Sequence, residues 1–337
     1  MGGTSTSYED LRDRSAFRAA SGTTFAHTAA MASTPAHLRE IHESVDPKRV
    51  NTLGWKGREC LDSPEHPLTI PVVVGFDETG SMGDAPYILQ ENLAELKGAT
   101  LKAGLDDAQL CFAAYGDAQN GEIAPCQVGQ FESGIEMDDW LNNLYIERMG
   151  GGNFGETPGL LLYFLAEHSK LDSLDKRGKK GYLILIGDER PLPKVTREEI
   201  KKYVDDDVQA DLTIDDVVAR AKEKYEIFMF LVNNSTAKQQ RSLEEWTRLL
   251  GADNVIVTQG LDNISEQIAM TLAVLEGTID DLDDAVSLLT DAGFDPGAAR
   301  KAGSAIEPLI GKVGVIPTGT GTLPTPTNTV GAGAERL

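Results

Sequence analysis

The stretch VVVGFDETGSMGDAP, residues 72–86, joins an apolar run to three oxygen-bearing side chains at alternate positions. The preceding run, TIPVVVGF, is apolar almost throughout, which is typical of a strand buried on both faces of a parallel sheet. The alternate side chains are those of Asp77, Thr79 and Ser81, and residues two apart in an extended segment point the same way. We therefore expect a buried strand to end in a turn that gathers one carboxylate and two hydroxyls.

Segments of strand and helix character alternate on either side of this stretch. Such alternation requires crossover connections, so it predicts a doubly wound α/β fold with a mostly parallel central sheet flanked by helices. Pro125 places EIAPCQVGQF at an edge of that sheet. The other expected strands are AQLCFAAYGD, GYLILIGDE, EIFMFLVNN and NVIVTQ; the expected helices are 86–102, 137–146, 158–169, 196–204, 213–225, 242–251 and 264–277.

Several of these helices are preceded by residues that are typical of a helix N-terminus. Asp84 is a candidate N-cap for the helix at 86–102. Thr157 is expected to cap the helix that has Pro158 at its first position. Thr196 and Glu199 have the spacing of a capping box, and Thr213 begins its helix in the same style.

Composition divides the chain into five regions. The first 45 residues are rich in Ser, Thr, Ala and Gly, have no clear core of their own, and are expected either to stay mobile or to lie on the main domain or a partner. The last residues are rich in Pro, Thr and Gly, which predicts disorder. The regions are an N-terminal arm (1–45), an irregular lead-in (46–67), the α/β domain (68–277), a small helical appendage (278–310) and a tail (311–337).

Net charge narrows the class of partner. The chain has 53 acidic and 31 basic residues among 337, a formal charge of −22. A field of that sign repels phosphate backbones and anionic lipid, so we expect neither nucleic acid nor a membrane as partner. Three widely spaced cysteines form no CxxC pair, which favours a reducing, cytoplasmic setting, and neither a signal peptide nor a membrane-spanning run is visible.

Polar residues follow three of the expected strands. Asp77 ends the first, Gly116 and Asp117 end the second, and Asp188 and Glu189 end another. In open parallel sheets, ligands bind at the carboxyl ends of the strands. One carboxylate with neutral hydroxyls is a poor acid–base pair but a good partial shell for a hard dication, because Mg²⁺ takes oxygen ligands and retains several waters.

Other kinds of site could use the same residue types. A capped turn between strand and helix would also place a carboxylate and hydroxyls together. The glycines at 150–152 could suggest a phosphate cradle, but no GK[ST] follows them. The TGSMG segment lacks the first glycine of a GxSxG nucleophile elbow, and the histidines lack metal-site spacing.

The segment DETGSMG resembles the metal-ion-dependent adhesion site of von Willebrand factor A-type (vWA) domains, with the pattern Asp-x-Ser-x-Ser. The resemblance implies a vWA fold over residues 65–277 and makes Asp77, Thr79 and Ser81 the ligands of the first loop. It implies a third-loop ligand at Asp188 and a second-loop ligand in GGGNFGETP, for which Asn153 is the candidate and Glu156 and Thr157 are the alternatives. The run RECLDSPEHPLTIPVVVGFDETGSMG also resembles an uncharacterised subgroup of microbial and phage vWA proteins.

The resemblance implies a non-enzymatic, Mg²⁺- or Mn²⁺-dependent module that captures an Asp or Glu side chain of a partner protein. Two settings are expected, an intracellular adaptor beside a MoxR-type AAA+ ATPase and a component of a virion or other large assembly. The localisation is then cytoplasmic, or in the virion if a phage encodes the chain. The alternatives are a structural subunit with a vestigial metal site and a metal-dependent phosphoesterase.

Overall fold

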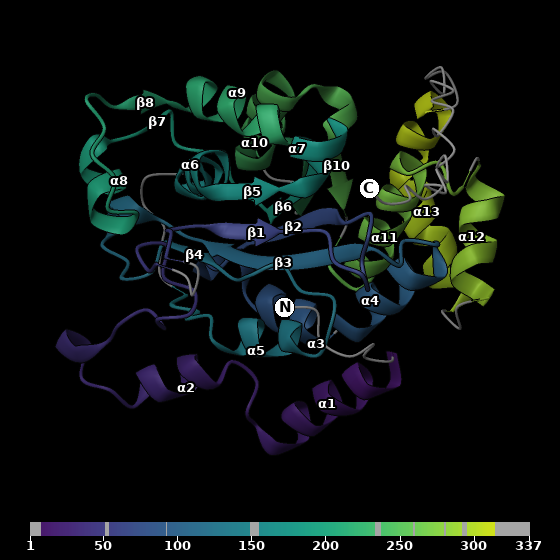
Figure 1. Cartoon of the computed structure of the whole chain (residues 1–337), viewed down its shortest axis with the longest axis horizontal. Coiled ribbons are helices and arrows are strands. Elements are labelled where there is room, and N and C mark those ends of the chain that lie inside the picture. The colour runs from purple at the N-terminus through teal and green to yellow at the C-terminus, as the bar shows by residue number, and fades with distance from the viewer. Residues whose placement is uncertain are drawn as a thin grey trace, which may run out of the picture.

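The computed structural model describes residues 8–50, 54–91, 93–148, 155–232, 237–258, 260–279, 281–291 and 295–313. Figure 1 shows a central sheet with a layer of helices on either side and further helices beyond one end. Asn153 and the tail from residue 314 onward lie outside the described residues.

The central sheet contains six strands in the order β4-β3-β2-β6-β9-β10. All neighbouring pairs are parallel except β3 with β4. The chain begins in the middle, runs to one edge, and returns to complete the other half, which confirms the predicted doubly wound sheet. The strands are β2 (Ile70–Asp77), β3 (Ala108–Tyr115), β4 (Cys126–Val128), β6 (Gly181–Gly187), β9 (Tyr225–Val232) and β10 (Val255–Thr258).

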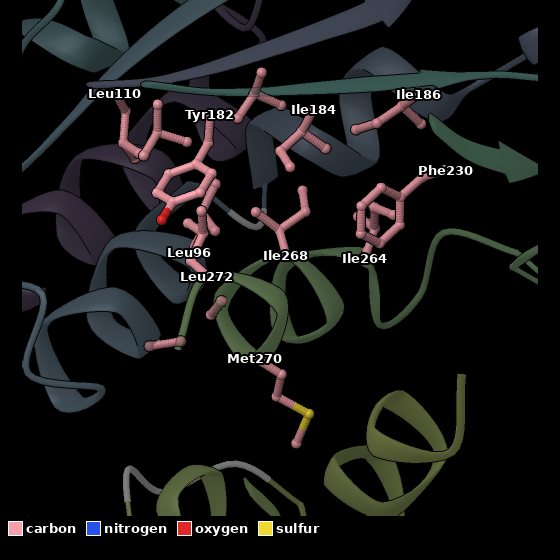
Figure 2. Close-up of a cluster of buried hydrophobic side chains, with 14 of the residues drawn as sticks. Leu96, Leu110, Tyr182, Ile184, Ile186, Phe230, Ile264, Ile268, Met270 and Leu272 are labelled. Atoms are coloured by element: carbon pink, nitrogen blue, oxygen red, sulfur yellow. The ribbon is translucent and has the colours of Figure 1, made fainter. Parts of the chain in front are cut away.

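Alternate residues of each strand point to opposite faces and form two cores. On β2, Val72 and Val74 enter one core while Val73 enters the other. The helices over the first core include α4 (Leu93–Lys102), α5 (Glu136–Asn142) and α11 (Ile264–Leu275), and those over the second include α6 (Pro158–His168), α9 (Ile214–Lys224) and α10 (Ala237–Leu250). Figure 2 shows part of the first core, where Ile184 and Ile186 of β6 face Ile268 and Ile264 of α11. Burial on both faces explains why these strands are continuous apolar runs.

The helices of the α/β domain follow the predicted order. The expected helix at 86–102 is covered by α3 and α4, between which residue 92 lies outside the described residues. The helix expected at 137–146 ends earlier, at Asn142. Both capping boxes are confirmed, at Thr196 and at Thr213. The helices are α3 (Ala85–Glu91), α4 (Leu93–Lys102), α5 (Glu136–Asn142), α6 (Pro158–His168), α7 (Asp172–Arg177), α8 (Arg197–Tyr203), α9 (Ile214–Lys224), α10 (Ala237–Leu250) and α11 (Ile264–Leu275).

Two short strand pairs lie outside the central sheet. One joins β1 (Arg58–Cys60) to β5 (Ser169–Leu171) in parallel, and so ties the lead-in to the end of α6. The other joins β7 (Lys194–Val195) to β8 (Leu212–Thr213) in antiparallel fashion.

The N-terminal segment packs on the α/β domain. It contains α1 (Tyr8–Ser21) and α2 (Ala26–Ala32), and α1 lies against α3 and α4 (Figure 1). Leu11, Phe25 and Val45 are fully buried in the first core. The segment therefore contributes apolar side chains to the core of the domain.

The helical appendage consists of α12 (Leu282–Asp291) and α13 (Pro296–Val313). Val286 and Leu289 are buried, and α13 packs on both α11 and α12. The second helix continues to Val313, past the predicted end of the appendage at residue 310. Among the described residues, no helix combines the length and the apolar character needed to cross a bilayer.

Candidate metal site

The first loop of the site begins where β2 ends. Asp77 pairs in register with Tyr115 of β3 and is 1% exposed. Its Oδ1 accepts hydrogen bonds from the Thr79 backbone N–H, at 2.8 Å, and from the Thr79 hydroxyl, at 2.6 Å. These bonds curl the chain out of the sheet, and Gly80–Met82 then form a single 3₁₀ turn. The three alternate residues of the sequence therefore lie in a compact turn around the Asp77 carboxylate.

The third loop meets the first across the central pair of strands. Asp188 directly follows β6, which lies beside β2. The Ser81 hydroxyl donates to Asp188 Oδ1 at 2.8 Å, and the Ser81 and Thr79 hydroxyl oxygens are 3.2 Å apart. Four of the five predicted site residues, Asp77, Thr79, Ser81 and Asp188, thus form one chain of contacts at the point where the strand order reverses.

Gly187, the last residue of β6, has no side chain and so leaves room for the Tyr115 hydroxyl beside the site. A Cβ added at Gly187 would lie 2.5 Å from the Tyr115 hydroxyl oxygen and 3.4 Å from Asp77 Cβ. The Tyr115 hydroxyl passes beneath Gly187 to donate to the carbonyl of Ile186 at 2.9 Å. Gly187 is therefore required by the space that Tyr115 occupies under the site.

The described end of the second loop is tied to both neighbouring loops. The Glu156 N–H donates to the Arg190 carbonyl, and the Thr157 N–H donates to the Gly116 carbonyl. Thr157 occupies the predicted N-cap position of α6 but makes no side-chain cap; its hydroxyl oxygen instead accepts from the Ala118 N–H at 2.7 Å. Thr157 therefore stands at the predicted N-cap position, but its hydroxyl bonds a neighbouring loop and not its own helix.

Buried carboxylates surround these loops. Burial raises the pKa of Asp77 to about 8, against the opposing effect of its hydrogen bond from Thr79 and with a further rise from Asp188. Burial and the charge of Asp77 raise the pKa of Glu156 to about 10. Burial and Glu122 hold the pKa of Glu78 well above its usual range. The site is thus a region of low dielectric in which burial and mutual repulsion favour the protonated acids, and a bound cation would favour their ionised forms.

Several oxygens of these acids lack a hydrogen-bond partner. They are Asp77 Oδ2, Asp117 Oδ2, Glu122 Oε1 and Glu156 Oε2, and all four atoms are inaccessible to solvent. Asp117 also caps the turn that follows β3, through its Oδ1. A buried acceptor without a donor is costly, so these oxygens mark where a cation, or water bound to one, would be stabilised.

The donor set fits a hard dication of the Mg²⁺ type. Asp188, Thr79 and Ser81 would hold it, with Asp77 acting directly or through water. No group of three or more His, Cys, Asp or Glu side chains in the described part of the chain is arranged to hold an ion alone. Hydroxyls and water must therefore complete the shell.

Glu78 and Glu122 were missed by sequence reasoning. Glu78 Oε2 accepts from the Glu147 N–H at 2.8 Å, and Glu122 Oε2 accepts from the Asp117 N–H at 2.6 Å. Glu147 lies far along the chain from Glu78, so no local pattern could show that contact. For Glu78 the available signal was its position beside Asp77 at the end of a buried strand.

No protein-family model and no curated protein matches the chain. Among solved structures it is similar to the pilus adhesin SpaC from Lactobacillus rhamnosus GG (10% identity, 65% of this chain and 31% of that one, TM-score 0.42). It is also similar to proximal thread matrix protein 1 from the mussel byssus, in a structure with a zinc-occupied MIDAS motif (12% identity, 64% and 50%, TM-score 0.40). A third similar structure is a von Willebrand factor type A protein from Catenulispora acidiphila (13% identity, 61% and 42%, TM-score 0.35). The chain spans between about a third and a half of the length of these proteins.

Proposed function

We propose that the chain is a non-enzymatic, metal-dependent protein-binding module. Mg²⁺ or Mn²⁺ at the candidate metal site would take an Asp or Glu side chain of a partner protein as its remaining ligand. The observation that carries the proposal is the chain of contacts from Asp77 through Thr79 and Ser81 to Asp188, which gathers oxygen ligands from two loops at the strand ends.

Charge makes such binding conditional on the ion. Without a cation, the acids at the strand ends offer an incoming carboxylate no attractive charge, and the net charge of −22 repels it. With a divalent cation in place, the same carboxylate gains a ligand bond in a direction fixed by the loops. We propose an intracellular adaptor or an assembly component as the setting, with a MoxR-type AAA+ ATPase or a virion component as the partner.

A phosphoesterase is less favoured. Two-metal hydrolysis uses several carboxylates that converge on a pair of ions, and the described residues offer no group of three such ligands. Turnover of generic phosphate esters in Mn²⁺, lost in Asp188→Ala, would reverse this preference.

The first experiment is calorimetric titration of Mg²⁺ and Mn²⁺ into the wild-type chain, Asp77→Ala and Asp188→Ala. We expect binding by the wild type and a loss of at least tenfold in each variant. The second is affinity purification of the tagged chain in Mg²⁺ and in EDTA, with Asp188→Ala as control. A partner retained in EDTA and by the variant would show a constitutive structural subunit instead of a metal-gated module.

A further inference from the structure

A small cavity lies at the edge of the central sheet, where β10 ends and α11 begins. Its volume is about 230 Å³, and its walls come from the end of β10, the start of α11, and α13 of the appendage (Figure 1). That volume is several times the roughly 30 Å³ that one water occupies, but it is below the roughly 300–1,000 Å³ of pockets for drug-sized ligands. Since β9 and β6 lie between β10 and β2, the cavity is separate from the candidate metal site.

Gln267 of α11 brings an unused hydrogen-bond acceptor to this cavity. It lines the cavity and is 4% exposed. Its Nε2 donates to the Thr258 hydroxyl at 3.1 Å, and that hydroxyl donates its single hydrogen to the Gly260 carbonyl at 2.7 Å. The Thr258 oxygen can therefore only accept from Gln267, which fixes the orientation of the Gln267 amide. The remaining oxygen, Oε1, accepts no hydrogen bond, and a buried acceptor of this kind is costly without a donor.

Asn263 brings a second amide to the cavity. It is 8% exposed, lines the cavity and lies one turn before Gln267 along α11. Asparagine at an N-cap normally accepts a hydrogen bond from the first turn of its helix, but the Asn263 side chain makes no such bond. Nor does that side chain form a hydrogen bond with any other described residue. The Asn263 amide therefore has both its donors and its acceptor available to a ligand.

The charges around the cavity favour an anion with a donor group beside it. The N-terminus of a helix is the positive end of its dipole, and α11 is 12 residues long. Lys301 of α13 lines the cavity and forms no ion pair with a described acid, although the chain carries a net charge of −22. Asp262 also lines the cavity, and an ionised carboxylate only accepts hydrogen bonds. The lining thus matches a ligand that carries both a negative group and a donor.

We propose that this cavity binds a small carboxylate that has a hydroxyl or ammonium group on the adjacent carbon. The carboxylate would accept from Asn263 Nδ2 and Lys301 Nζ at the N-terminus of α11, and the adjacent group would donate to Gln267 Oε1. Small hydroxy acids and amino acids share this chemistry. The inference does not rest on the proposed function, because none of these residues belongs to the candidate metal site.

The test is calorimetric titration of L-lactate, L-alanine and propionate into the full chain. These compounds are similar in size, and propionate lacks the donor. Because the candidate metal site is itself proposed to take a carboxylate, the titrations use buffer without divalent cations. We expect a dissociation constant of about 1 mM or lower for L-lactate or L-alanine, and about tenfold weaker binding of propionate. Binding of L-lactate alone would identify a hydroxy acid as the ligand, and binding of L-alanine alone an amino acid.

Two neighbouring residues of α13 provide matched charge variants. Lys301→Gln removes the cation that lines the cavity and should weaken binding of the preferred ligand about tenfold. Arg300→Gln removes the same charge from an exposed position outside the lining, where water screens it, and should change binding less than about twofold. Gln267→Met removes the bare acceptor, so the preference over propionate should disappear.

Three results would overturn the proposal. The first is a wild-type chain that binds none of the compounds, and the second is propionate binding as tightly as the other two. The third is an equal loss in Arg300→Gln and Lys301→Gln, which would show a general effect of net charge in place of a site. Both α13 variants change exposed residues, and the comparison with propionate uses the wild type, so these results do not depend on the folding of Gln267→Met.

Discussion

At the scale of single residues, the hydroxyls of Thr79 and Ser81 prepare the site for an ion. Each hydroxyl has one hydrogen, and each lies closer to a carboxylate (2.6 and 2.8 Å) than to the other hydroxyl (3.2 Å). With both hydrogens directed at carboxylates, the hydroxyl oxygens of Thr79 and Ser81 present lone pairs to each other. A cation can use those lone pairs while both hydrogen bonds remain, so binding requires little rearrangement of the first loop.

The packing of Gly187 on Tyr115 gives a test at this scale. In Gly187→Ala the new methyl would overlap the Tyr115 hydroxyl, so we expect a loss of about 1–3 kcal/mol of unfolding free energy. In the Tyr115→Phe background the hydroxyl is gone, and the remaining neighbours are at 3.4 Å, so the same alanine should cost much less. Denaturant unfolding of the wild type, both single variants and the double variant measures this coupling. Additive effects would show that the glycine is needed for some other reason.

At the scale of elements, α4 places a lysine in the first core. Lys97 is 2% exposed, and its Nζ donates to the carbonyl of Ala108 at 3.2 Å. Burial lowers its pKa to about 8, although Asp106 and Asp107 oppose the shift. A helix that covers an apolar sheet therefore includes one cation that is costly to keep charged.

Replacing that lysine should stabilise the protein at neutral pH. We expect Lys97→Met to raise the unfolding free energy at pH 7 by roughly 1–3 kcal/mol, since the native state no longer holds a buried charge. Between pH 8 and about 10.5 the unfolded chain keeps the Lys97 proton while the native state loses it, so wild-type stability gains relative to the variant as pH rises. Unfolding curves for both proteins at pH 7, 8.5 and 10 measure this difference. A constant difference across that range would contradict the assigned pKa shift.

Most elements could be predicted from sequence because their signals are local. Burial on both faces makes β2 and β6 continuous apolar runs, and the capping boxes at Thr196 and Thr213 lie within four residues. The partner of the Thr157 hydroxyl could not be predicted, because Ala118 comes from another loop. Glu78 was missed for the same reason: the fold, and no sequence spacing, brings its carboxylate to the Glu147 N–H.

At the scale of the whole molecule, the N-terminal segment is joined to the α/β domain by an acid and two arginines. Asp138 of α5 is 1% exposed in its side chain and accepts from Nε of both Arg14 and Arg18 of α1. Asp139 contacts the same two arginines but is 53% exposed. Together with Leu11 and Phe25 in the core, these contacts make the segment part of one packed body. In a chain with an excess of 22 negative charges, the arginines of α1 also offset repulsion locally.

The two aspartates provide a matched pair of variants. Asp138→Asn removes a buried charge from both arginines, so it should lower the free energy of docking α1 by about 1–3 kcal/mol and speed tryptic cleavage at Arg14 and Arg18. Asp139→Asn removes an exposed partner of the same arginines, which is screened by water, and should change the cleavage rate little. Limited proteolysis with mass analysis of the N-terminal fragments compares the two. Equal cleavage rates for both variants would mean that apolar burial of Leu11 and Phe25 alone holds the segment, and that the buried carboxylate adds nothing to its docking.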